Sequence, residues 1–222
     1  TEMLNFLSHD LRSPLVSITA LIDHAEARRP GEAVSGLLSR MRKHTETSID
    51  LAEQFLQLAR AESSEAHEFQ ELDLAAVAWN ALEQVWAQAR SRNIRLRHQF
   101  HLEDSWVLGE GNLLERAVVN LLTNAIKYSP DGTVVSVRME QADEQHIRLC
   151  VIDQGAGIPE SEIPGLFDRF SRLEQASDRG AKGIGLGLAF VEAVVRCHGG
   201  EVEVTSEEGR GACFCILLRQ IQ

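Results

Sequence analysis

Hydrophobic residues recur at alternating three- and four-residue steps in the first part of the chain. One stripe runs from Leu4 to Ala25, and a second runs from Val34 to Ala59. Steps of this kind form the apolar seam of a coiled coil or a helical bundle. An Arg-Pro-Gly sequence between the two stripes breaks the pattern. We therefore predict two long antiparallel helices over residues 1–62, joined by a short turn.

Two helices alone bury too little apolar area to be stable. We therefore expect residues 1–62 to be a helical hairpin that pairs with a second copy as a dimeric four-helix bundle. Residues 63–71 are polar and aperiodic, which indicates a linker.

Helical and strand periods alternate through residues 72–222. The predicted helices are Ala75–Arg92, Leu113–Tyr128 and Leu186–His198, and the predicted strands are Ile94–Phe100, Val134–Glu140, Ile147–Asp153, Glu201–Ser206 and Ala212–Leu218. Such alternation is typical of an α/β sandwich in which helices cover one face of a sheet. Residues 154–183 carry Gly, Pro and charge with little periodicity, and we assign them no element.

Composition narrows the choice of partners. The 222 residues are 44% hydrophobic and carry a formal net charge of −11. An acidic chain is a poor match for nucleic acid, whose phosphates require clustered Lys and Arg. No apolar run approaches the ~18 residues of a membrane helix, so we expect no membrane contact from this fragment. The chain begins inside a helical pattern with no cap before Met3, and we expect it to be part of a longer protein.

The four cysteines fit no zinc-binding spacing. Cys213 and Cys215 would share one face of a strand, as small apolar residues. We expect all four to be inert thiols in a reducing compartment, the cytoplasm. The alternative is a redox or metal-binding role.

His9 is the first candidate for chemistry. On a helix whose seam includes Leu7 and Leu11, His9 faces solvent. A neutral imidazole is a good nucleophile when its second nitrogen donates to a carboxylate, and Asp10 is adjacent. Pro14 cannot donate to the carbonyl of Asp10 and is expected to kink the helix just past the histidine. The alternative is an ordinary exposed surface histidine.

Polar residues share one face of the predicted helix Leu113–Tyr128. They are Asn120, Asn124, Lys127 and Tyr128. Amide oxygens suit a hard cation such as Mg²⁺, lysine suits phosphate, and an aromatic ring suits a base or ribose. The alternative is a polar face that only contacts solvent.

Two glycine-containing segments complete the candidate site. Asp153 ends a buried strand, and Gly155 and Gly157 leave room for a planar ligand beside its carboxylate. Further on, Gly183-Ile184-Gly185-Leu186-Gly187-Leu188 opens a helix, where main-chain N–H groups can approach phosphates. Alone, the first segment could be a simple turn and the second a flexible hinge.

A basic cluster precedes the second glycine segment. Its members are Arg169, Arg172, Arg179 and Lys182. In an acidic chain such a cluster indicates a small polyanion. Small and glycine residues between Arg172 and Gly183 offer little apolar area to offset the entropy of ordering, so we expect a lid that becomes ordered around its ligand.

Taken together, these segments resemble the bacterial sensor histidine kinases over nearly the whole chain. The H-box is His9 with Asp10 and Pro14, the N-box runs from Asn120 to Tyr128, the G1 box from Asp153 to Gly157, the F-box from Phe167 to Phe170, and the G2 box from Gly183 to Leu188. The resemblance implies a dimerisation and phosphotransfer hairpin followed by an ATP-binding domain of the Bergerat fold, shared with gyrase and the heat-shock chaperone ATPases.

The resemblance also implies roles. His9 would receive the γ-phosphoryl group of ATP, with Asp10 assisting, and pass it to an Asp of a response regulator receiver domain. Asn124 would bind Mg²⁺ with Asn120, and Asp153 would accept a hydrogen bond from the adenine amino group. The other nucleotide-binding positions would be Lys127, Tyr128, Gly155, Gly157, Arg172, Lys182, Gly183, Gly185, Leu186, Gly187 and Leu188.

A comparison with the family's ATP-hydrolysing relatives distinguishes hydrolysis from phosphoryl transfer. These relatives carry a water-activating Glu where this chain has Asn120, and an amide cannot act as a base. We therefore predict transfer to His9 rather than hydrolysis. The alternatives are a nucleotide-binding pseudokinase or scaffold dimer without transfer activity, and an ATPase or protein-serine kinase of the same fold. The fragment is expected in the cytoplasm, with a parent protein that can be anchored in the inner membrane.

Three positions depart from the family's pattern. Ser13 stands where Thr or Asn is usual, which leaves phosphatase activity open. Ile184 replaces a small or hydroxylated residue. The segment Gly211-Ala212-Cys213-Phe214 resembles the family's final box, in which Ala212-Cys213 stands where a Thr is common. None of these positions belongs to the expected transfer machinery.

Overall fold

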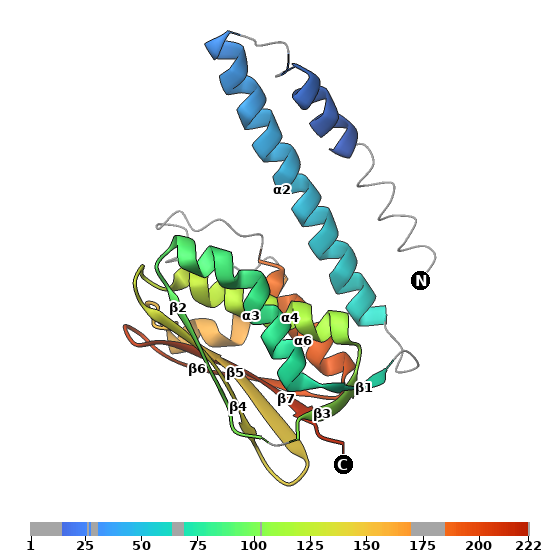
Figure 1. Ribbon diagram of the computed structural model, residues 1–222, viewed down its shortest axis with the longest axis vertical. Helices are drawn as coiled ribbons and strands as arrows, with labels where there is room; N and C mark the ends of the chain where they lie inside the picture. Colours follow the sequence, from blue (N-terminus) through green and yellow to red (C-terminus); the bar gives the residue numbers. More distant parts are fainter. Residues whose placement is uncertain are drawn as a thin grey trace. The chain divides into compact units, whose positions relative to one another are not determined.

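The computed structural model describes residues 15–25, 27, 31–63, 69–102, 104–169 and 185–221. The chain divides into two compact units, Thr1–Ser63 and Ser64–Gln222 (Figure 1). In the described part of the chain, every helix is too short or too polar to span a bilayer.

The described part of the first unit is a pair of helices. Residues 15–25 are helical, and α2 is the helix Glu32–Ser63. The two helices run side by side in opposite directions (Figure 1). An ion pair joins them, with Arg42 Nη2 2.6 Å from Asp23 Oδ1, and Ile22 and Leu38 are buried.

A five-stranded sheet in the order β2-β4-β5-β7-β6 forms the second unit's centre. Its strands are β2 Arg95–Phe100, β4 Val134–Gln141, β5 His146–Ile152, β6 Glu201–Glu207 and β7 Gly211–Arg219. The β2–β4 pair is parallel and the other pairs are antiparallel. Helices α3 Leu74–Ser91, α4 Gly111–Tyr128 and α6 Gly187–Cys197 cover one face (Figure 1). The predicted α/β sandwich is confirmed, and these elements lie within two residues of their predicted ends.

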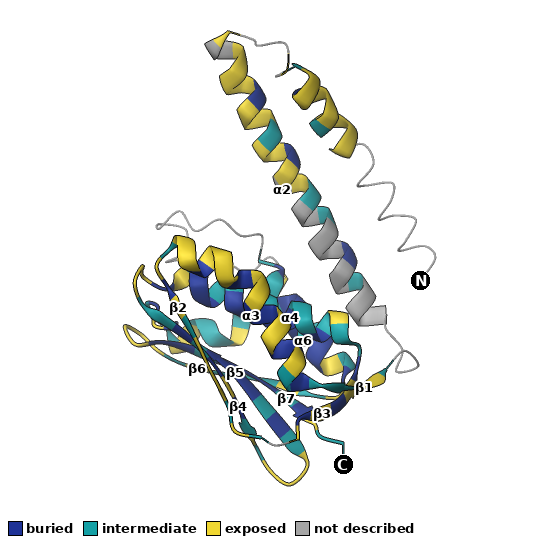
Figure 2. Ribbon diagram, in the orientation of Figure 1, coloured by how far each residue is buried: buried dark blue, intermediate teal, exposed yellow. Residues whose placement is uncertain are grey.

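The core lies between this sheet and the three helices. Alternation along β5 directs Ile147, Leu149 and Val151 into it, each at most 1% exposed. The buried sides of the helices face them (Figure 2), and these sides carry apolar residues such as Leu82, Leu121 and Val194. Arg148 and Cys150 point to the opposite face, over which no described helix of this unit packs (Figure 1).

A second, two-stranded sheet was not predicted. Strand β1, Gln70–Asp73, pairs antiparallel with β3, Trp106–Gly109. The assignment of residues 63–71 to a linker is therefore wrong at its end, because Gln70 and Glu71 belong to β1. Four residues with two carboxylates carry no strand period of their own, and pairing with β3 supplies the structure.

Asp73 connects this small sheet to α3. It is the N-cap of α3, and its Oδ1 accepts from the main-chain N–H of Ala75 at 3.0 Å. The hydroxyl of Ser105, which precedes β3, also donates to Asp73 Oδ1. These two hydrogen bonds to Asp73 fix the start of the unit.

The structure corrects the expectation of four inert thiols. Cys150 on β5 stands directly opposite Cys215 on β7, and their sulfur atoms form a disulfide. Cys197 and Cys213 are not part of this disulfide. The sequence could not show this bond, because it depends on which two strands pair and in which register.

Candidate nucleotide-binding site

Helix α4 carries a row of polar side chains beside the core. Asn120, Asn124 and Lys127 are half-buried and Tyr128 is exposed. The residues between them on the other side of the helix are buried: Leu121, Leu122, Ala125 and Ile126. Because this apolar side packs into the core, the polar side chains must lie on the side of α4 that faces away from the core.

Lys127 and Tyr128 interact with each other at the end of α4. The ammonium of Lys127 donates to the hydroxyl of Tyr128 at 3.1 Å and lies 4.7 Å from its ring centroid. A ligand that stacked on the exposed Tyr128 ring would therefore have the Lys127 ammonium close to its anionic groups.

Arg92 holds the C-terminal end of α4, a role that sequence reasoning missed. Its Nη1 donates to the carbonyls of Ile126 and Lys127 at 2.5 and 3.0 Å, and its Nη2 donates to Ser129 at 3.0 Å. Its guanidinium also pairs with Asp131 at 2.7 Å. A cation at this end complements the helix dipole. A basic residue at the end of the preceding helix is a weak signal, and the contact spans 34 or more residues of sequence.

Asp153 follows β5 and is only 8% exposed. Its Oδ1 accepts main-chain hydrogen bonds from Gly155 at 2.7 Å and Ala212 at 3.2 Å. Burial raises the pKa of the Asp153 carboxyl above its ordinary value, and these two bonds oppose the increase. Both bonds use Oδ1, so Oδ2 is available to a donor on a ligand.

The backbone around Asp153 approaches its neighbours too closely for side chains. A Cβ at Gly155 would lie 2.8 Å from Asp153 Oδ1 and 2.9 Å from the carbonyl oxygen of Tyr128. Gly157 has φ +72°, and a Cβ there would lie 2.1 Å from the carbonyl oxygen of Glu207. These contacts bring the loop after β5 against the end of α4 and the β6–β7 turn.

The segment before α6 approaches the other end of the polar row. Gly185 has φ +77°, Leu186 is the buried N-cap of α6, and Gly187 and Leu188 begin the helix. A Cβ at Gly187 would lie 3.9 Å from Asn120 Oδ1. The N-terminal N–H groups of α6 therefore lie close to an amide of α4.

Three of the predicted motifs thus come together along the C-terminal half of α4. Asn120 adjoins Gly187, Tyr128 adjoins Gly155, and Asp153 bonds to Gly155. The remaining candidates lie outside the described residues: His9, Asp10, Arg172, Lys182 and Gly183. The same holds for the predicted lid, residues 172–183.

Comparisons with known proteins identify the class. A family model described as histidine kinase-, DNA gyrase B- and HSP90-like ATPase matches residues 109–222. The chain belongs to this family, and the matched residues lie within the second compact unit. Named relatives then narrow the class, because they are sensor histidine kinases: the chain contains a histidine kinase catalytic core.

The relatives extend over both units. The chain is 37% identical to the signal transduction histidine-protein kinase/phosphatase MprB of Mycobacterium sp. (strain KMS), with 98% of this chain and 43% of MprB covered. A solved structure of a mycobacterial sensor histidine kinase MprB is 36% identical over 68% of this chain and 97% of its own, with a TM-score of 0.59. The structure of full-length ShkA in complex with AMPPNP shares the fold, with a TM-score of 0.80 at 23% identity over 100% of this chain and 46% of ShkA. The chain therefore spans less than half the length of its MprB relative.

Proposed function

We propose that this chain binds Mg-ATP in its second unit, transfers the γ-phosphoryl group to His9, and passes it to an Asp of a response regulator receiver domain. The observation that carries the proposal is the environment of Asp153. A buried carboxylate is held through one oxygen by two main-chain donors, in a loop without room for side chains. Its second oxygen is an acceptor for the adenine amino group.

The polar row of α4 fits the other end of the nucleotide. Asn120 and Asn124 would offer carbonyl oxygens to Mg²⁺, a hard cation that keeps several waters and binds few protein ligands. Lys127 would neutralise phosphate charge. In the proposed site, the N-terminal N–H groups of α6 near Asn120 would donate to phosphate oxygens. ShkA, which shares the fold, is described as a complex with the ATP analogue AMPPNP.

The residue types favour transfer over hydrolysis. Phosphoryl transfer requires positioning and charge neutralisation more than covalent chemistry by the protein. Asn120 is half-buried beside Gly187, and its amide cannot remove a proton from water. A nucleophile must therefore come from elsewhere, and His9 with Asp10 provides an imidazole with a neighbouring carboxylate.

The first unit supports a homodimer through residues 1–62. Large apolar side chains are exposed on the hairpin, among them Leu21 at 69%, Leu37 at 53% and Val34 at 50%. A second hairpin would bury them as a four-helix bundle. We place this kinase core in the cytoplasm, where ATP and the response regulator are available.

Radiolabel transfer tests the proposal. Purified protein incubated with Mg²⁺ and γ-labelled ATP should acquire label that is acid-labile and alkali-stable, as expected for phosphohistidine. His9→Ala should abolish labelling and leave ATP affinity within about twofold, because the two sites lie in different units. Asn124→Ala should lose labelling together with Mg-ATP binding.

Other outcomes would separate the alternatives. Nucleotide binding without any label on His9 would identify a pseudokinase, and acid-stable label would identify a serine or threonine acceptor. Rapid release of free phosphate with no phosphoprotein would identify an ATPase.

A further inference from the structure

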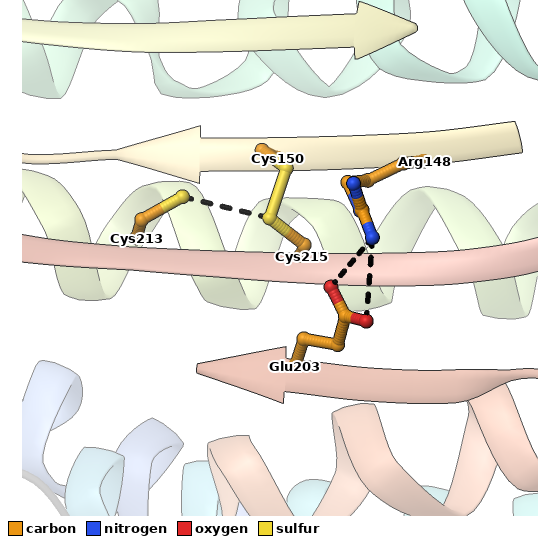
Figure 3. Close-up of a disulfide and its surroundings, with 5 residues drawn as sticks. All are labelled: Arg148, Cys150, Glu203, Cys213 and Cys215. Atoms are coloured by element: carbon orange, nitrogen blue, oxygen red, sulfur yellow. Dashed lines mark hydrogen bonds and ion pairs between the residues drawn. A yellow bond between two sulfur atoms is a disulfide. The ribbon is translucent and has the colours of Figure 1, made fainter. Parts of the chain in front are cut away.

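Three of the four cysteines gather on the sheet face opposite the helices. Cys150 on β5 forms the disulfide with Cys215 on β7, and Cys213 lies two residues away on the same face of β7 (Figure 3). The sulfur atoms of all three lie within 4.8 Å of one another. The Cys213 sulfur is 3.5 Å from that of Cys215, which is a distance suited to attack on the disulfide.

The three residues differ in their access to solvent. Cys150 and Cys215 are 4% and 7% exposed, while Cys213 is half-buried. Arg148 reaches across β7 to Glu203, at 3.1 Å, on the side of the disulfide away from Cys213 (Figure 3). A thiol from solution therefore meets Cys213 more readily than either sulfur of the disulfide.

We propose that Cys150, Cys213 and Cys215 form a thiol–disulfide exchange site in which Cys213 connects the buried disulfide to dithiols in solution. In the first step, the thiolate of Cys213 attacks Cys215 Sγ. The Cys213–Cys215 bond forms, the Cys150–Cys215 bond breaks, and Cys150 leaves as a thiolate that takes the proton released by Cys213. No electrons leave the protein in this step.

The second step uses an external dithiol. One of its thiolates attacks the half-buried Cys213 sulfur, and Cys215 leaves as a thiolate. The second thiol of the reagent closes on the first, which restores Cys213 and releases the oxidised reagent. Two electrons have then passed to the protein, and the exchange site carries three thiols in place of one thiol and a disulfide.

The backbone geometry permits the intermediate. Residues i and i+2 of a strand lie about 6.6 Å apart at ~3.3 Å per residue, which is near the upper end of the Cα separations seen in disulfides, about 4.4–6.8 Å. Exchange is therefore possible with a local bend in β7.

The reaction should speed up as pH rises. Burial raises the pKa of the Cys213 thiol, so little thiolate is present at neutral pH. Charged groups around the three cysteines act in both directions, and they are Arg138, Glu140, Arg148, Asp153 and Glu203. Formation of the Cys213 thiolate thus controls the first step.

The test measures how fast dithiothreitol reduces the disulfide under native conditions. Samples are quenched in acid, alkylated, and their free cysteines counted by peptide mass. Cys213→Ser and Cys213→Ala should each slow reduction by at least tenfold and weaken its dependence on pH, because both lack the internal nucleophile. Cys197→Ser, which alters the cysteine on α6 outside the exchange site, should match wild type.

A second variant tests the intermediate directly. In a glutathione redox buffer, Cys150→Ser should form the Cys213–Cys215 disulfide, seen as a two-hydrogen loss in the peptide that contains both. Wild-type reduction rates in the Cys213 variants would overturn the proposal. So would persistent free thiols in Cys150→Ser, or four free thiols in wild type after treatment with oxidised glutathione.

Discussion

Asp153 and Ala212 bond to each other twice. The main-chain N–H of Asp153 donates to the carbonyl of Ala212 at 2.9 Å, and the N–H of Ala212 donates to the side-chain Oδ1 of Asp153 at 3.2 Å. The first residues of β7 therefore position the carboxylate that we assign to adenine. The following residue, Cys213, belongs to the exchange site, so the two sites share one stretch of backbone.

Asp153→Asn should weaken ATP binding by at least about tenfold, which is about 1.4 kcal/mol, and leave the fold intact. The amide oxygen can still accept from Gly155 and Ala212. The amide nitrogen then replaces Oδ2, and a donor would face the donor on adenine. Calorimetric titration with a non-hydrolysable ATP analogue measures the affinity.

Asp143→Asn is the matched control, since Asp143 lies in the exposed loop between β4 and β5. This variant should bind the analogue as wild type does. If Asp153→Asn also retains full affinity, the base is recognised elsewhere.

Gly211→Ala and Gly209→Ala should differ strongly, although both residues lie at the β6–β7 turn with positive φ, +94° and +82°. A Cβ at Gly211 would lie 2.2 Å from the carbonyl oxygen of Asp153, while a Cβ at Gly209 meets nothing within 4 Å. Gly209→Ala should cost only about 1–2 kcal/mol for the left-handed backbone.

Gly211→Ala should cost more in unfolding free energy and also weaken nucleotide binding, because Asp153 must move. Urea denaturation and the same titration measure both effects. Equal losses in the two variants would mean that the turn relaxes freely and does not constrain Asp153.

Arg92→Ala should lower the free energy of unfolding by about 1.5–3 kcal/mol, the range for hydrogen bonds that involve a charged group. The variant removes the donor that satisfies three carbonyls at and beyond the end of α4. Arg90→Ala is the control, because Arg90 is exposed and its guanidinium lies 5.0 Å over the ring of Trp86. Such an exposed contact contributes about 0.5–1 kcal/mol. Urea denaturation should show a larger loss of unfolding free energy for Arg92→Ala than for Arg90→Ala. The reverse order would contradict the role of Arg92.

His198 should make stability depend on pH. Its Nε2 accepts from the N–H of Glu110 at 3.0 Å, which requires a neutral ring with the proton on Nδ1, facing the carbonyl of Val194. Burial lowers the pKa of His198 below its ordinary value of 6.5. The neutral ring therefore stabilises the fold above about pH 6.5, and this contribution is lost as pH falls toward the lower folded-state pKa.

Thermal unfolding between pH 7.5 and 5.0 checks this expectation. The wild type should lose stability more steeply over this range than His198→Gln, whose amide does not titrate. Parallel curves would show that His198 does not change protonation on unfolding.

Local periodicity explains what could be predicted from the sequence. The stripe in Leu113–Tyr128 gave both the helix and the direction of its polar row, because burial of Leu121 and Ile126 fixes Asn120 and Asn124 on the other side. Asp153 and its glycines were found because a charged residue that ends an apolar strand is itself a local signal.

The features that were missed depend on residues far apart in sequence. Strand β1 exists because β3 pairs with it, Arg92 reaches carbonyls more than 30 residues away, and 65 residues separate Cys150 from Cys215. No local period encodes such contacts, since they require the strand order and register of the folded unit.

The pairing of β1 with β3 also decides how an isolated ATP-binding domain should be produced. A recombinant fragment cut at residue 72 would remove Gln70 and Glu71, the partners of Gly109 and Leu108. Half of the hydrogen-bonding edge of β3 would then be open, beside Leu108 and Trp106, which are 48% and 45% exposed. Open strand edges with apolar side chains recruit other chains and aggregate. Fragments that start upstream of Gln70 should therefore stay monodisperse at concentrations at which shorter ones precipitate.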